Sequence, residues 1–240
     1  MVPWTGAILI LVVSVFRHDQ RRRWLDLTTV IGYTVYVAVG TQLFLLLAER
    51  VTRTYDSAFL RADALLGFNP VAFADAISHH WIVFVLLLLS YVSLPAVIGV
   101  AWVLEQDLLM RRAVLFGGCL CFAFYALFPA VGPGQFDWTR QVPTPYAPDN
   151  CMPSMHLTWA LLIAINARSL RLRIGLWIYA AAMVVATLAL REHYLIDLIA
   201  AVPYTLGVQW AARRWERYQP VLKRTLPQSE KEILRGPVAP

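Results

Sequence analysis

Charged residues are scarce in this sequence of 240 residues, in which Lys, Arg, Asp and Glu together make up 15%. Hydrophobic residues reach 59%, and the mean hydropathy is +0.57. A water-soluble domain usually devotes about a quarter of its residues to charge. The low share of charge therefore excludes an ordinary soluble domain and predicts a polytopic membrane protein.

Cysteine and lysine are also rare. The three cysteines, Cys119, Cys121 and Cys151, are odd in number, and the first two lie inside an apolar run. They therefore provide neither a disulfide framework nor a metal cluster of recognisable spacing. We interpret them as packing residues and expect no metal and no cofactor. The only lysines, Lys223 and Lys231, stand in the C-terminal tail, so arginine carries most of the positive charge.

The net charge of +6 arises mainly from arginines in short segments between apolar runs. This distribution is typical of loops that orient a membrane protein, so we expect the bilayer and a lipid as partners and no nucleic acid. If the apolar runs alternate in direction, all these segments lie in the cytoplasm, with Arg111 and Arg112 as anchors at its boundary. The segments 49–80, 132–153 and a turn at 191 then lie on the extracytoplasmic side, where we expect any active site. We expect the protein in the plasma membrane.

Seven hydrophobic runs approach the length of roughly 20 residues that a membrane crossing requires. The arginines of the first run follow its apolar part, the reverse of a cleavable signal peptide, which indicates a retained anchor. The last two runs are too long together for one crossing, so a tight turn is expected near Arg191. The runs are 2–16, 27–48, 81–104, 113–131, 154–167, 174–190 and 192–212.

These runs predict an all-α fold, a polytopic membrane helix bundle with a six-helix core and a short N-terminal anchor helix. We assign residues 1–26 to the anchor and a basic cytosolic loop, 27–212 to the membrane core, and 213–240 to a basic, partly disordered cytosolic tail. Within segment 55–80, Gly67 ends one short helix and the pair Asn69-Pro70 begins another, so two interfacial helices are expected there.

The stretch REHYLID, residues 191–197, is the first candidate for chemistry. On a helix, His193 and Asp197 share one face, and the carboxylate can accept the Nδ1 proton and leave Nε2 free as a nucleophile. Ionisable groups within a span are costly and usually mark function. The alternative is a buried polar pair that only holds helices together.

The stretch CMPSMHLTW, residues 151–159, is expected on the same side. Pro153 suits a first helical turn, whose free N–H groups attract anions, while Ser154 can add a hydrogen bond and His156 lies within that turn. Either histidine could be structural. Together with His193 and Asp197, however, they form a set suited to phosphoryl transfer without a metal.

Cations must neutralise the phosphate oxygens in such a reaction. Arg191 and Arg140 are the local candidates. Arg140 lies in a loop rich in proline and glycine, residues 132–150, which is long enough to form a lid. Arg140 is therefore either a phosphate contact or a solvated loop residue.

The motifs PSMH (153–156) and HYLID (193–197) resemble, in order and spacing, two motifs of the type-2 phosphatidic acid phosphatase superfamily. The resemblance covers about residues 81–212. It implies His193 as nucleophile, His156 as general acid, Asp197 as the group that orients His193, and Ser154 as a phosphate contact.

Two departures from that family pattern point to one branch of it. The Lys-x6-Arg-Pro motif is absent, and Ala186 and Thr187 occupy the positions of the Ser-Arg pair, so Arg191 would have to replace the missing arginine. Met155 before His156, together with the His-Tyr-x2-Asp pattern, resembles the inositol phosphorylceramide and sphingomyelin synthases.

We therefore expect an integral membrane lipid phosphatase or phosphotransferase that acts through a phosphohistidine intermediate. The alternatives are a transporter, which tends to place broken helices and polar groups at the bilayer midplane, and an assembly subunit whose histidines only pack. The lipid, the choice between hydrolysis and transfer, and the oligomeric state are not legible in the sequence.

Overall fold

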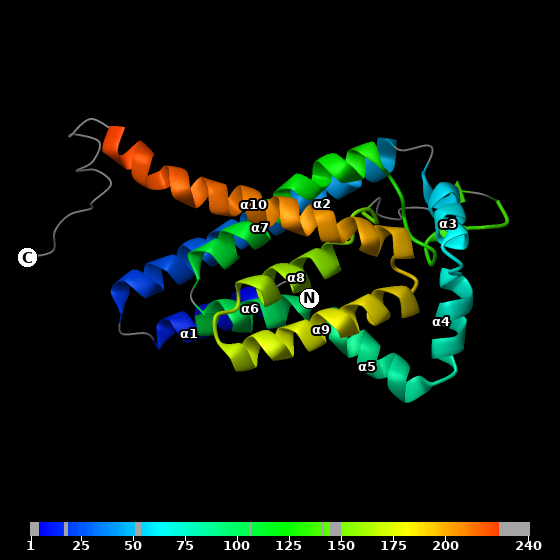
Figure 1. The fold of residues 1–240 in the computed structure, drawn as a ribbon, viewed down its shortest axis with the longest axis horizontal. Helices are drawn as coiled ribbons and strands as arrows, with labels where there is room; N and C mark the ends of the chain where they lie inside the picture. The colour runs from blue at the N-terminus through cyan, green and yellow to red at the C-terminus, as the bar shows by residue number, and fades with distance from the viewer. Residues whose placement is uncertain are drawn as a thin grey trace, which may run out of the picture.

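The computed structural model describes residues 5–16, 19–50, 54–105, 107–140, 142–144 and 150–225. These residues form an all-α membrane helix bundle, as expected from the sequence, and one short two-stranded hairpin, which was not expected (Figure 1). The elements are α1 (Thr5–Val15), α2 (Gln20–Arg50), α3 (Asp56–Leu65), α4 (Pro70–Ser78), α5 (Trp81–Val92), α6 (Leu94–Glu105), α7 (Leu108–Leu127), β1 (Phe136–Asp137), β2 (Val142–Pro143), α8 (Met155–Asn166), α9 (Leu170–Ala189) and α10 (Leu195–Thr225).

The helices differ in their ability to cross a membrane. Over the described ranges, α7, α9 and the Leu195–Tyr218 part of α10 are long and apolar enough to cross, and α4 and α5 meet at 117° as a bent pair. Helices α1, α6 and α8 are apolar but shorter. The expected run 81–104 is helical but is divided at Ser93 into α5 and α6, close to Pro95, whose nitrogen has no N–H to donate to a helical hydrogen bond.

The two short helices expected in segment 55–80 are confirmed as α3 and α4. Gly67 follows α3 with a φ of 73°, a left-handed conformation that suits glycine. Asn69 caps α4, since its Oδ1 accepts hydrogen bonds from the backbone N–H groups of Val71 and Ala72, each at 3.0 Å. Both helices lie across the end of the bundle at which α10 begins (Figure 1).

The tight turn expected near Arg191 is also confirmed. Helix α9 ends at Ala189, and Arg191 has a φ of 59°. The Gly134 N–H donates to the Arg191 carbonyl at 2.8 Å, and a Cβ on Gly132 would lie only 2.4 Å from the Glu192 carbonyl oxygen. Glycine therefore lets the loop after α7 lie directly against the turn before α10.

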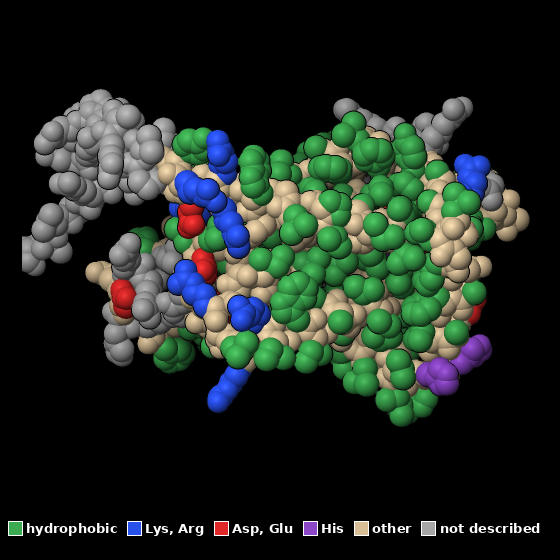
Figure 2. Space-filling model, viewed as in Figure 1, with side chains coloured by type: hydrophobic (Ala, Val, Ile, Leu, Met, Phe, Trp, Pro, Cys, Tyr) green, Lys and Arg blue, Asp and Glu red, His purple; other side chains and the backbone are tan. Residues whose placement is uncertain are grey.

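Arginines gather at the opposite end of the bundle. Figure 2 shows hydrophobic side chains over the middle of the molecule and most of the visible Lys and Arg at its left end, where α9 begins and the C-terminal part of α10 lies. Arg168, Arg173, Arg213 and Arg217 line one cleft of about 790 Å³ there. Two basic segments that are distant in sequence thus share one end, as the alternation of runs predicted.

Arg111 corrects the expectation of an anchor in the headgroup region. Its side chain is only 2% exposed and pairs with Asp26 at 2.9 Å, while Thr29 Oγ1 and the Trp102 carbonyl accept further hydrogen bonds from it. Because α2 begins at Gln20 instead of residue 27, Asp26 lies inside a helix. The ion pair therefore joins α2 to α7 within the bundle.

A second polar contact links α8 to α10. The amide groups of Asn166 and Gln209 exchange two hydrogen bonds, each of 2.8 Å, and both side chains are buried. The two buried amides satisfy each other, so the pair holds the two helices together.

Candidate active site

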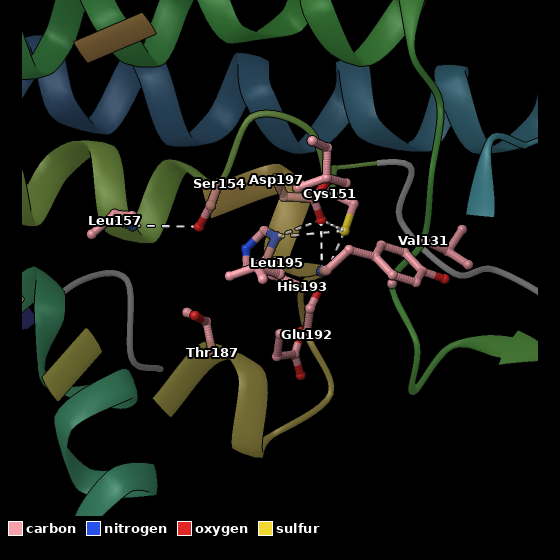
Figure 3. A network of polar contacts seen from close by, with 12 residues as sticks. Val131, Cys151, Ser154, Leu157, Thr187, Glu192, His193, Leu195 and Asp197 are labelled. Carbon is pink, nitrogen blue, oxygen red and sulfur yellow. Dashed lines mark hydrogen bonds and ion pairs between the residues drawn. The ribbon is translucent and has the colours of Figure 1, made fainter. Parts of the chain in front are cut away.

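His193 does not lie on a helix, so the expected shared helical face with Asp197 is wrong. It stands in the turn before α10, whereas Asp197 occupies the first turn of that helix. Asp197 Oδ2 accepts a hydrogen bond from the backbone N–H of Tyr194 at 2.8 Å, as the third helical residue of a capping box does. This cap folds the turn back, and His193 Nδ1 lies 3.5 Å from the same Oδ2 (Figure 3).

Cys151 lies at the centre of this cluster, which the sequence did not indicate. Its thiol donates a hydrogen bond of 2.6 Å to Asp197 Oδ2, and its Sγ lies 3.5 Å from His193 Nδ1 (Figure 3). Burial raises the pKa of the Cys151 thiol well above its ordinary value, and the nearby Asp197 carboxylate raises it further. The thiol is therefore a protonated donor to the carboxylate, and interpreting it as a packing residue was incomplete.

His156 faces His193 from the first turn of α8. The two ring centroids are 6.0 Å apart, with the ring planes inclined at 64°. On its other side, His156 stacks on Tyr91 of α5, with centroids 4.1 Å apart and planes at 24°. The structure thus brings together the two imidazoles that the sequence placed at one depth.

Ser154 is the N-cap of α8 and is fully buried. Its Oγ accepts a long hydrogen bond of 3.4 Å from the Leu157 N–H, and its own N–H donates to the Asp197 carbonyl at 3.4 Å. The sequence suggested that Pro153 occupies the first helical turn. The helix instead begins at Met155, so Pro153 precedes the N-cap. Ser154 nevertheless contacts the first turn of α10, which carries Asp197.

The two candidate cations have carboxylate partners. The Arg191 guanidinium pairs with Asp75 of α4. Arg140 is 82% exposed and lies 3.6 Å from Asp137 Oδ2 on the hairpin of β1 and β2. The proposed lid, residues 132–150, falls partly outside the described residues, since 141 and 145–149 are not among them.

Two aspartates of α3 support the site, and sequence reasoning missed this role. Asp56 accepts hydrogen bonds from the Tyr194 hydroxyl at 2.8 Å and from the N–H groups of Val131 and Gly132. Asp63 accepts from the Leu195 and Ile196 N–H groups at 2.8 and 2.9 Å, so it caps α10. The available signal was their spacing of seven residues, which places both carboxylates on one face of α3.

Burial raises the pKa of Asp56 and of Asp63, while the hydrogen bonds that each carboxylate accepts from the chain oppose the shift. Both carboxylates are buried. Their hydrogen bonds to Tyr194, Leu195 and Ile196 therefore stabilise the geometry of the turn before α10.

The cluster offers distinct chemical groups at one point. Two facing imidazoles can take and give protons, and the Asp197 carboxylate can hold the Nδ1 proton of His193. Cys151, His193 and Asp197 also present sulfur, nitrogen and oxygen atoms within 4.8 Å of one another, a spacing compatible with a metal ion.

A family model described as the PAP2 superfamily matches residues 57–211, which is more than half of the chain. The match begins in α3, ends in α10 and contains both histidine motifs. No curated protein and no solved structure matches the chain significantly.

Proposed function

Because the chain belongs to the PAP2 superfamily, a group of phosphatase-like membrane proteins, we propose that it cleaves or transfers a phosphate ester of a lipid. The single observation that carries this proposal is the pair of facing imidazoles, His193 and His156, with centroids 6.0 Å apart. Histidines whose only role is packing have no need to meet beside a buried carboxylate.

The geometry supports His193 as the nucleophile. When the ring proton stays on Nδ1, which faces Asp197 Oδ2, the lone pair of the neutral ring lies on Nε2 and can attack phosphorus. A nitrogen–phosphorus bond forms as the bond to the lipid oxygen breaks. His156, whose ring faces that of His193, supplies the proton that the leaving oxygen takes up. Water or an alcohol then gives its proton to His156 as its oxygen attacks phosphorus. The nitrogen–phosphorus bond breaks, and the product is free phosphate with water or a new phosphate ester with an alcohol.

The phosphate oxygens require donors. Ser154 lies at the N-terminus of α8, where helix N–H groups favour anions. Arg191 is two residues before His193, and it becomes available to a phosphate when it leaves Asp75. Arg140 projects from the exposed hairpin and can contact a headgroup only as a headgroup approaches from outside.

Transfer to an alcohol is the version of this reaction that the residues favour. Met155 precedes His156 and packs in a buried cluster with Cys121 and Tyr125, in place of the small residue of the phosphatase motif. This resembles the synthase branch of the superfamily. We place the site at the extracytoplasmic face of the plasma membrane, because the arginine-rich end of the bundle lies opposite to it.

Turnover of radiolabelled lipids by the purified protein tests the proposal. Phosphatidic acid, phosphatidylglycerol phosphate, polyprenyl diphosphates and inositol phospholipids are supplied with or without diacylglycerol or ceramide as acceptor. Either His193→Ala or His156→Ala is expected to remove more than about 99% of turnover, equivalent to roughly 3 kcal/mol of transition-state stabilisation. His79→Ala, an exposed histidine at the end of α4, is the matched control and keeps full activity.

Undiminished activity in His193→Ala would contradict the mechanism. A labelled product that contains the acceptor identifies transfer, whereas free phosphate identifies hydrolysis.

The side of the membrane is tested separately by introducing one exposed cysteine at a time into a Cys119→Ser background, in which the remaining Cys121 and Cys151 are buried. An impermeant thiol reagent applied to intact cells is expected to label a cysteine introduced at Arg140 and not one introduced at Arg217. The opposite pattern would place the site in the cytoplasm.

A further inference from the structure

Cys151, His193 and Asp197 form a compact set of three different ligand atoms. The Sγ to Nδ1 and the Nδ1 to Oδ2 distances are both 3.5 Å, and the Sγ to Oδ2 distance is 2.6 Å. The residues are 1%, 4% and 0% exposed. They come from two separate segments, the loop before α8 and the turn before α10, so the fold and not local sequence assembles them.

These distances suit a tetrahedral zinc ion. Zinc binds thiolate sulfur at about 2.3 Å and nitrogen or oxygen at about 2.0–2.1 Å, which places neighbouring ligand atoms about 3.5 Å apart. Two of the three separations already have this value. The third is short because the thiol donates a hydrogen bond to the carboxylate, and it widens once that proton is replaced by an ion.

The second carboxylate oxygen supports the same inference independently. Asp197 Oδ1 is buried and has no hydrogen-bond partner among the described residues. A buried carboxylate oxygen without a partner is costly, and a cation beside it removes that cost.

We propose that Cys151, His193 and Asp197 bind a thiophilic divalent cation such as Zn²⁺, and that the bound ion blocks phosphoryl transfer at His193. The blocking step rests on the proposed function, whereas the binding step does not. Thiolate and imidazole ligands select zinc over magnesium or calcium, which prefer oxygen ligands. A water molecule completes the coordination at the fourth position.

The chemistry of the imidazole ring explains the block. A neutral imidazole has one N–H and one lone pair. When the ion takes the lone pair at Nδ1, the ring proton must reside on Nε2, so Nε2 has no lone pair with which to attack phosphorus. The Cys151 thiol loses its proton to solvent, and its sulfur binds the ion. Metal binding and nucleophilic attack therefore exclude each other at one ring.

Metal binding is measured first, without reference to activity. The full-length protein in detergent is stripped with EDTA, exchanged into chelator-free buffer and titrated with Co²⁺, whose thiolate-to-cobalt absorption band reports a sulfur ligand; competition with Zn²⁺ gives the zinc affinity. Wild type is expected to bind one ion. Cys119→Ser, which alters an exposed cysteine on α7, is the matched control and binds equally.

Cys151→Ser is expected to lose the absorption band and to bind Zn²⁺ at least about 100-fold more weakly. His193→Ala, which removes a different ligand, is expected to show a similar loss of affinity. Thermal unfolding of each variant in EDTA verifies that it is folded. Absence of the band in wild type, or its retention in Cys151→Ser, overturns the site.

Inhibition is measured second. Addition of Zn²⁺ is expected to suppress lipid turnover by wild type and by Cys119→Ser, and EDTA restores it. Tight zinc binding with unchanged turnover overturns the blocking step. If no lipid is turned over even in EDTA, the proposed function fails, while the cobalt titration still decides whether the metal site exists.

Discussion

Tyr91 stacks on His156, with ring centroids 4.1 Å apart, and the His156 ring in turn faces that of His193 at 6.0 Å. One residue of α5 therefore contacts the first turn of α8, which carries one of the two candidate histidines. The bent pair of α4 and α5 is thus connected to the site directly, although none of its own residues carries the proposed chemistry.

Tyr91→Ala removes the stacking partner of His156 and is expected to lower kcat by about tenfold, since a ring pair contributes about 0.5–1.5 kcal/mol. Tyr91→Phe keeps the ring and is expected to retain kcat within about threefold. Steady-state kinetics on the lipid found to be a substrate measures both. Equal losses in the two variants would show that the hydroxyl, and not the stacking, matters.

Asp63→Ala leaves the N–H groups of Leu195 and Ile196 without their acceptor. Each lost partner costs about 1–3 kcal/mol, so the apparent Tm in detergent is expected to fall by several degrees. Arg61→Ala, an exposed change on the same helix, serves as the control and leaves the Tm unchanged. Similar melting of both variants would mean that the cap of α10 contributes nothing.

Arg111→Ala leaves the Asp26 carboxylate buried without its cation and is expected to destabilise the bundle by about 3–5 kcal/mol. The neighbouring Arg112→Ala is expected to cost less than about 0.5 kcal/mol. The double variant Asp26→Leu, Arg111→Met should recover much of the loss, because two apolar side chains replace the pair. Denaturant unfolding in mixed micelles compares the four proteins.

Asp75→Ala frees the Arg191 guanidinium from its ion pair. If Arg191 binds the phosphate, this variant lowers KM, whereas Arg191→Ala raises KM by about tenfold or more, consistent with the loss of a charge-assisted hydrogen bond. Initial rates over a range of lipid concentrations in mixed micelles give both values. Unchanged KM in both variants would remove Arg191 from the set of phosphate ligands.

Features set by local backbone chemistry were predictable. Gly67 and Asn69-Pro70 marked the end of α3 and the start of α4, because a left-handed residue and an N-cap act within a few residues. The turn at Arg191 followed from the length of two apolar runs. The meeting of His156 and His193 followed from the alternation of helices, which places both at one end of the bundle.

Apart from the meeting of His156 and His193, contacts between particular side chains that are distant in sequence were not predictable. Cys151 meets Asp197 across 46 positions of sequence, and Asp56 meets Tyr194 across 138. The spacing of His193 and Asp197 fits a helix and a capping turn equally, and only the packing of the preceding loop selects the turn. Arg111 was misjudged because the rule for positive charge concerns which side a loop occupies and says nothing about burial.

The amide exchange between Asn166 and Gln209 has a consequence for the opposite end of the bundle. Helices α8 and α10 run in the same direction, and each carries a candidate catalytic residue, His156 or Asp197, near its start. If one helix slid along the other, both hydrogen bonds between these buried amides would break. The two amides lie about three helical turns from the site, and they thus fix the relative height of His156 and Asp197 without touching either.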